Sequence, residues 1–257
     1  MTATPAVALV TGAASGMGQL AARRLAAAGA SVAAVDVDGD GLAATVLRAP
    51  TMRSWECDVT DAGAVEQLVK EVESAFGPID RLVHAAGVCL PGLLAEQRVV
   101  ELDRTIAVNY LGTAHAVLSV LPGMLDRRHG EVVAFASLAG WLPSPHLGAY
   151  SASKHAVVAF MEVLAYENRG SGVRFACVCP PVVDTPMVAG IRARDDAALA
   201  GQRGIEPGIV LDAIERSLDA DELFVFPGRG TKGVWRGRRF APGLIWRQIE
   251  RATSRRG

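Results

Sequence analysis

Short apolar runs of strand length alternate along this chain with longer segments whose apolar residues recur at helical spacing. The expected strands are residues 6–10, 31–35, 53–57, 81–85, 132–136, 173–179 and 223–226. The longest helical segments between them are 96–127 and a helix that bears Tyr150 and runs to about Asn168. This alternation predicts an α/β fold, a doubly wound parallel sheet (Rossmann fold) of about seven strands with helices on both faces.

No internal repeat, low-complexity linker or break in composition interrupts the pattern before a basic segment at the end. We therefore expect residues 1–257 to form a single domain with a basic C-terminal extension at 228–257. From Gly228 to Gly257 there are eight Arg, one Lys and one Glu, a net charge of +8, so the rest carries −9 to give the total of −1. A charge block of this kind can attract an anionic surface or partner.

Half of the residues are apolar, which is enough for a sizeable core and argues against disorder. No apolar run approaches the roughly eighteen residues of a membrane span, and the short, uncharged N-terminus does not resemble a signal peptide. The cysteines (Cys57, Cys89, Cys177 and Cys179) form no Cys-x-x-Cys pair. Disulfides and a metal site are therefore not expected, and a reducing, cytoplasmic location fits best.

The first strand leads through a glycine-rich loop, residues 11–18 (TGAASGMG), into a helix. This arrangement presents backbone N–H groups and a helix N-terminus to a phosphate, and the glycines permit a close approach. A plain glycine turn would have the same loop, but a strand, loop, helix and second strand in register favour dinucleotide binding. The expected contacts are Gly12, Ser15, Gly16, Met17 and Gly18.

Asp36 ends the second strand about twenty residues beyond the loop, where a carboxylate can accept a hydrogen bond from a ribose 2′-hydroxyl. The same carboxylate would repel a 2′-phosphate. Neither the loop nor position 37 holds an Arg or Lys that could receive such a phosphate. The expected cofactor is therefore NAD rather than NADP.

Tyr150 and Lys154 lie four residues apart and so share one face of a helix. An ammonium near a phenol favours the phenolate, which predicts a Tyr150 pKa below its reference of about 10 and an acid/base able to work near neutral pH. Alone, such a pair is common on amphipathic helices without any catalytic role. Two further polar residues are candidates for a site with Tyr150: Ser137, directly after the fifth strand, and Asn109, in the long preceding helix.

Taken together, these motifs resemble the short-chain dehydrogenase/reductase family over roughly residues 5–227. The matching residues are Thr-Gly-x-x-x-Gly-x-Gly at 11–18, Asp58-Val59, Asn109, Ser137 and Tyr-x-x-x-Lys at 150–154. The resemblance implies that Tyr150 exchanges a proton with the substrate alcohol, while Lys154 lowers its pKa and bonds the nicotinamide ribose. It further implies that Ser137 orients the substrate oxygen and that Asn109 holds a water in a proton relay.

The resemblance also implies cofactor contacts from the ends of other strands, at Asp58, Val59, Ala85, Ala86, Gly87, Val183 and Thr185. The chain departs from the family pattern twice. The usual Asn-Asn-Ala-Gly reads HAAG at 84–87, and the usual Pro-Gly reads PP at 180–181. His84 is expected to be a packed core residue, and the second proline, which lacks an N–H and a flexible φ, alters the path toward Thr185.

The loops expected to face the substrate, 89–94 and 141–147, are mostly apolar and hold no cluster of Arg or Lys. We therefore expect an NAD(H)-dependent oxidoreductase that interconverts a hydrophobic secondary alcohol and its ketone, a steroid-, terpenoid- or lipid-like molecule. Packing is almost as good an interpretation of Trp141 and Leu147 as substrate contact. Residues 186–206, with their glycines, are expected to form a substrate lid that excludes water on closure.

Several alternatives stay open. A non-catalytic dinucleotide-sensing or scaffold protein could use the same fold, although it would not need all four catalytic candidates. A helix at 242–252 could dock the dehydrogenase on an anionic membrane surface, but we favour a solvated helix that packs on its own subunit or on a neighbouring one. Nucleic-acid binding is not expected, because no recognised module is present. The family resemblance implies a homodimer or homotetramer built on the helices of Asn109 and Tyr150.

Overall fold

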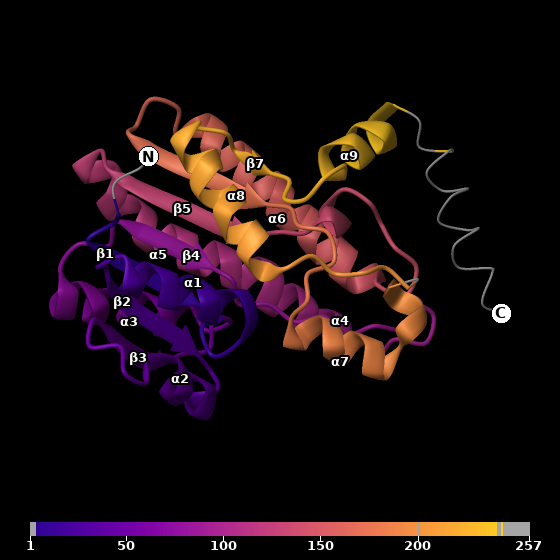
Figure 1. Ribbon diagram of the computed structural model, residues 1–257, viewed down its shortest axis with the longest axis horizontal. Coiled ribbons are helices and arrows are strands. Elements are labelled where there is room, and N and C mark those ends of the chain that lie inside the picture. The colour runs from indigo at the N-terminus through magenta and orange to yellow at the C-terminus, as the bar shows by residue number, and fades with distance from the viewer. Residues whose placement is uncertain (1–3, 200, 241–242, 244–257) are drawn as a thin grey trace.

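A computed structural model describes residues 4–199, 201–240 and 243. The described residues form one sheet of seven parallel strands in the order β3-β2-β1-β4-β5-β6-β7 (Figure 1). The strands are β1 Val7–Thr11, β2 Ser31–Asp36, β3 Met52–Glu56, β4 Arg81–His84, β5 Gly130–Phe135, β6 Val173–Val178 and β7 Phe224–Val225. The chain winds outward from β1 in one direction and from β4 in the other, so the predicted doubly wound sheet is confirmed. Ligands of such sheets bind where the winding reverses, here between β1 and β4.

Helices cover both faces of the sheet. They are α1 Gly16–Ala27, α2 Gly39–Val46, α3 Ala62–Phe76, α4 Val99–Ile106, α5 Gly112–Arg127, α6 Gly148–Glu167, α7 Pro186–Arg194, α8 Pro207–Asp219 and α9 Thr231–Phe240, with shorter turns η1 Ala107–Leu111, η2 Leu138–Gly140 and η3 Asp196–Leu199. Helices α1 and α8 pack on one face, and α3, α5 and α6 on the other. Side chains alternate along each strand, so every strand contributes to both apolar cores.

Helix boundaries follow local chemistry that is visible in the sequence. Asp61 caps α3 by accepting a hydrogen bond from the Ala64 N–H at 3.0 Å, and the helix ends at Gly77, whose φ of 95° favours glycine. Thr185 caps α7 in the same way, through the Val188 N–H at 3.4 Å. Such caps fix where the strand ends meet the helices, and therefore where the residues of the site emerge.

The predicted helix at 96–127 is present but contains a π-helical turn at η1. The continuous stretch Val99–Arg127 is long and apolar enough to span a membrane by length and composition alone. Here it is a core helix, since α5 buries Val117, Val120 and Leu121 in the core that faces α3 and the sheet. The π turn contains Asn109, and such turns occur frequently at functional sites.

Two segments are more helical than the sequence pattern indicated. Helix α2 follows β2, and the polar stretch of the expected lid holds α7 and η3. Helix α9 belongs to the basic extension and follows β7 at the upper right of Figure 1, where its Trp235 stacks on Phe226. The helix expected at 242–252 lies outside the described residues, apart from Gly243.

Candidate active site

A pocket of about 540 Å³ lies at the carboxyl ends of the strands, at the point where the winding of the sheet reverses. Most of the residues expected at a dinucleotide line it: Gly12, Ser15, Gly16, Met17, Gly18, Asp36, Asp58, Val59, Ala85, Ala86, Gly87 and Thr185. The sequence missed other lining residues, namely Val35, Val37, Cys57, Thr60, Val88, Arg104, Ala107, Val108, Pro186 and Met187. Residues from six separate segments of the chain thus line one pocket, whose glycines, hydroxyl groups and carboxylates suit a dinucleotide.

The glycine loop is shaped so that backbone, rather than side chains, faces this pocket. A Cβ at Gly12 would lie 2.6 Å from the Ala86 nitrogen, and one at Gly18 would lie 2.1 Å from the Gly12 oxygen. Gly12 and Gly16 also have φ of 66° and 56°. The first turn of α1 begins at Gly16, so its free N–H groups face the loop. The loop therefore fits the pyrophosphate of a dinucleotide.

Asp36 lies at the end of β2, and backbone N–H groups hold its carboxylate in place. Its Oδ2 accepts from the Ala14 N–H at 3.0 Å, and its Oδ1 accepts from the Val37 N–H at 2.8 Å. These bonds fix a carboxylate at the edge of the pocket, where a ribose hydroxyl can donate to it. Arg104 of α4 is the one cationic side chain among the lining residues that the structure describes. Arg104 lies within the predicted helix at 96–127, so nothing in the sequence indicated that it would line this pocket.

The catalytic candidates lie behind Gly87, at the inner end of the pocket. A Cβ at Gly87 would lie 3.2 Å from Asn109 Oδ1 and 3.7 Å from Lys154 Nζ. Ser137 caps η2, with its Oγ accepting from the Ala139 N–H at 3.1 Å, and its side chain is hydrogen-bonded to Tyr150. The fold therefore brings together the four residues that the sequence singled out from three separate segments.

The pKa of Tyr150 departs from the predicted direction. Burial raises it above its usual value, the Cys89 thiol adds to the rise, and the hydrogen bond with Ser137 opposes it. The Lys154 ammonium lies 5.8 Å from the ring centroid of Tyr150 and instead donates to the Phe135 carbonyl at 2.6 Å. The prediction that Lys154 gives Tyr150 a lowered pKa is therefore wrong for the protein alone, because desolvation outweighs the distant ammonium.

Asn109 joins the end of β4 to α6. Its Nδ2 donates to the Val88 carbonyl and to Ser153 Oγ, both at 2.9 Å, and its Oδ1 accepts from the Val88 N–H at 2.8 Å. Ser153 in turn donates to the Tyr150 carbonyl at 2.7 Å. The asparagine thus positions the tyrosine helix against the pocket, whereas its expected role in a water relay stays a prediction.

The two departures from the family pattern have different consequences. His84 is buried, as expected, with Nδ1 2.9 Å from Thr11 Oγ1 and with no partner for Nε2 among the described residues. Burial, and then the charge of Lys154, lower its pKa to about 3. After the second proline, Val183 turns into the core and does not line the pocket, although Thr185 does.

Tyr150 also borders a small apolar cluster. Its buried members are Leu147, Val188, Ile191, Ala198 and Leu199, and Cys89, Tyr150 and Val182 pack against it. Most of these come from α7 and η3, so the segment expected to be a lid covers the tyrosine. Leu147 faces this cluster, whereas Trp141 packs elsewhere, on Phe224, Phe226 and Trp235. The packing interpretation thus holds for Trp141.

A hydrogen bond and an ion pair hold the covering segment in place. His146 Nδ1 lies 2.6 Å from Asp195 Oδ2, at the end of α7. Arg194 donates to Glu101 of α4 at 3.1 Å, and this bond, followed by one from Arg98, lowers the pKa of Glu101. The covering segment thus packs its apolar residues against Tyr150 and pairs its charged residues with His146 and Glu101.

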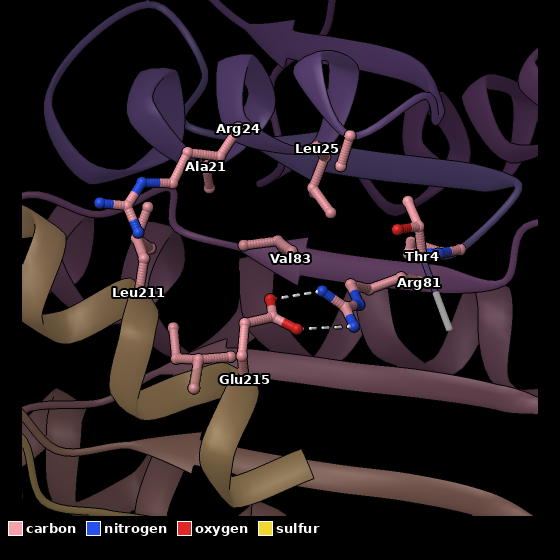
Figure 2. Close-up of a pocket in the computed structure, with 11 residues that line it drawn as sticks. Thr4, Ala21, Arg24, Leu25, Arg81, Val83, Leu211 and Glu215 are labelled. Atoms are coloured by element: carbon pink, nitrogen blue, oxygen red, sulfur yellow. Dashed lines mark hydrogen bonds and ion pairs between the residues drawn. The ribbon is translucent and has the colours of Figure 1, made fainter. Parts of the chain in front are cut away.

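A second pocket, of about 190 Å³, lies between α1 and α8 over the central strand β4. Figure 2 shows Arg81 and Glu215 at its base, joined by hydrogen bonds at 2.7 and 3.2 Å. Arg81 also pairs with the buried Glu131, which pairs with Arg174. These charges satisfy one another and link three strands to α8, so they stabilise the fold and leave no free group for a ligand.

A doubly wound sheet with a glycine loop, a ribose-side carboxylate and a serine–tyrosine pair defines a Rossmann-fold oxidoreductase. The chain belongs to the short-chain dehydrogenase/reductase family, because residues 6–196 match the family model described as short chain dehydrogenase. It is 34% identical over 235 residues to 2,3-dihydro-2,3-dihydroxybenzoate dehydrogenase of Bacillus subtilis (strain 168), covering 88% of this chain and 90% of that one. It is also 34% identical to 1-deoxy-11-beta-hydroxypentalenate dehydrogenase of Streptomyces avermitilis, covering 86% of this chain and 84% of that one.

Solved structures show the same likeness. A short chain dehydrogenase/reductase from Burkholderia phymatum in complex with NAD superposes with a TM-score of 0.85 at 29% identity, covering 95% of this chain and 96% of that one. An actinorhodin polyketide ketoreductase with NADPH has a TM-score of 0.81 at 30% identity, covering 90% and 98%. The chain is therefore an oxidoreductase that uses a nicotinamide dinucleotide.

Proposed function

We propose that this chain interconverts a hydrophobic secondary alcohol and its ketone with NAD(H), using Tyr150 as the acid/base. The observation that carries the proposal is the packing of Tyr150 against a cluster of apolar side chains from Leu147, α7 and η3. A nicotinamide dinucleotide accepts or supplies the hydride when it is bound. In oxidation the Tyr150 phenolate takes the hydroxyl proton, and in reduction the phenol returns it, while Ser137 holds the same substrate oxygen. The positive nicotinamide ring of NAD⁺ would favour this phenolate.

The names of the relatives support an alcohol as the substrate, since both are called dehydrogenases of hydroxylated compounds. The apolar cluster supports a hydrophobic one, because the aliphatic side chains that pack against Tyr150 offer a carboxylate or phosphate neither charge nor hydrogen bonds.

The preference for NAD rests on Asp36. Its carboxylate is fixed by backbone N–H groups at the edge of the pocket, and a 2′-phosphate there would meet a negative charge. Arg104 lines the same pocket from α4 and is the described cation that could offset such repulsion. We infer that Asp36 dominates, because its carboxylate is held in place on both oxygens.

The test is a substrate screen that follows the absorbance of NADH and NADPH. Sterols, terpenols and hydroxyacyl compounds are compared with small hydroxy acids and sugars, each with NAD and with NADP. We expect turnover of the apolar alcohols with NAD, and none in the Tyr150→Phe variant. Turnover confined to the charged or sugar substrates would contradict the hydrophobic site, and a preference for NADP would contradict the role of Asp36.

A further inference from the structure

Four aromatic rings pack together beside the turn that follows β5. Trp141 meets Phe224 edge-on at 5.2 Å between ring centroids, and Trp235 of α9 edge-on at 5.7 Å. Phe226 stacks on Trp235 at 5.3 Å. This aromatic cluster (Trp141, Phe224, Phe226 and Trp235) joins the basic C-terminal extension to the body of the protein, and Trp235 is the member that α9 contributes.

Trp141 is directly connected to the turn that carries Ser137. It ends η2, the three-residue turn capped by Ser137, and its N–H donates to the Leu138 carbonyl at 2.9 Å. Its indole Nε1 donates to the Cys179 sulfur at 3.4 Å, at the end of β6. The ring of Trp141 therefore cannot shift without disturbing the hydrogen bonds that shape this turn.

The other side of the turn is held by the tyrosine helix. A Cβ at Gly140 would lie 2.7 Å from the Lys154 carbonyl, so the turn packs directly on α6. The Leu138 N–H donates to the Pro180 carbonyl at 2.8 Å. Ser137 is thus placed by a turn fixed between α6 on one side and the aromatic cluster on the other.

We propose that Trp235 is a positioning residue of the active site, which holds Ser137 in register with Tyr150 by packing on Trp141. Helix α9 lies beyond residues 6–196, the part of the chain that matches the family model. The kinetic consequence rests on the proposed function, whereas the packing consequence does not.

Loss of the Trp235 ring should act on the reaction more than on cofactor binding. A displacement of about 1 Å at a catalytic group can cost on the order of 10²-fold in rate. The hydrogen bond with Ser137 is the contact that opposes the raised pKa of Tyr150. If Ser137 moves away from Tyr150, kcat should therefore fall. The rising limb of the pH–rate profile for alcohol oxidation (the pH limb) should also move to higher pH, while the affinity for NAD stays unchanged.

The experiment compares Trp235→Ala and Trp235→Phe with a matched control, Trp55→Ala, in the full chain. Trp55 lies on β3 and also packs edge-on against a phenylalanine, Phe76, at 5.7 Å, but it is far from the turn in sequence and at the other edge of the sheet. We expect Trp235→Ala to lower kcat about tenfold or more and to shift the pH limb. Trp235→Phe should restore most of both, and Trp55→Ala should change neither.

A second measurement does not depend on activity. Cys177 and Cys179 are buried, and the sulfur of Cys179 touches the Trp141 indole. We expect an aromatic disulfide reagent to label these thiols faster in Trp235→Ala than in wild type or Trp55→Ala. If labelling, kcat and the pH limb of Trp235→Ala all match those of Trp55→Ala, the positioning role is wrong. If wild type oxidises no alcohol, the proposed function fails, and the labelling rates alone then decide whether Trp235 holds the turn.

Discussion

The ammonium of Lys154 donates a hydrogen bond to the main-chain carbonyl of Phe135 at 2.6 Å, at the end of β5 and two residues before Ser137. The ammonium is buried, and burial lowers the pKa of Lys154 from 10.5 to about 8. One pKa unit corresponds to about 1.4 kcal/mol, so holding this charge inside the protein costs about 3 kcal/mol of stability. The buried ammonium therefore lowers the stability of the fold, although it lies beside the candidate site.

The Lys154→Met variant should be inactive and more stable than wild type at neutral pH. The folded state releases the lysine proton at a lower pH than the unfolded state does, so wild-type stability should rise between about pH 8 and 10.5. Lys154→Met should lack this rise, while Lys70→Met, on the exposed face of α3, should keep it. Urea unfolding at several pH values measures both effects, and a wild-type stability that is flat over this window would contradict them.

The Tyr150→Phe variant should lose turnover while keeping the cofactor. Removing a general acid/base costs typically 10²- to 10⁴-fold in rate, and Tyr150 is not among the residues that line the dinucleotide pocket. Steady-state turnover and NADH binding, followed by fluorescence, separate the two effects. Tyr166→Phe is the matched control, because Tyr166 lies on the same helix with its ring 66% exposed. Residual turnover close to that of wild type would remove Tyr150 as the acid/base.

The Asp36→Asn variant should narrow the preference for NAD over NADP. Asparagine keeps one acceptor oxygen for the backbone N–H groups but removes the charge that repels a 2′-phosphate. A charged hydrogen bond is worth about 1.5–3 kcal/mol, so the ratio of kcat/KM for the two cofactors should fall about tenfold or more. Adding Arg104→Ala should weaken NADP more than NAD if that cation meets the phosphate. An unchanged ratio in Asp36→Asn would show that the selectivity lies elsewhere.

The parts of the fold that the sequence predicted correctly are those set by local pattern. The strands are short apolar runs, and the Asp61 cap and Gly77 stop of α3 are visible in the sequence. Helix α2 was missed because it begins with Gly39-Asp40-Gly41, a poor start by propensity. Helix α7 was missed because its support is tertiary: Val188 and Ile191 are buried in a cluster completed by distant residues.

The same distinction between local sequence pattern and tertiary packing applies to the candidate site. The glycine loop, Asp36 and the Tyr150–Lys154 pair are short-range motifs. The structure places the loop and Asp36 in the dinucleotide pocket and the pair behind Gly87. The raised pKa of Tyr150 could not be read from its neighbours in sequence, since it arises from burial beneath residues about forty positions away. Arg104 and Trp235 were missed for the same reason, because each reaches the site only through the packing of helices.

His84 occupies the position of an asparagine in the family pattern. Its pKa is lowered to about 3 by burial and by the charge of Lys154, so the folded protein holds it neutral. The unfolded chain takes up this proton below about pH 6.5, so stability should fall as the pH drops through that value. The loss should reach about 2 kcal/mol by about pH 5, at 1.4 kcal/mol per pKa unit.

The His84→Asn variant should remove this acid sensitivity. Asparagine can keep a hydrogen bond to Thr11 and does not titrate, and the buried Nε2 that lacks a described partner disappears with the ring. Urea unfolding at about pH 7 and pH 5 measures the effect, with His129→Asn as the control, since the His129 side chain is 68% exposed. If His84→Asn loses as much stability on acidification as wild type and His129→Asn do, then the acid sensitivity arises from other groups, and His84 is not held neutral at a cost.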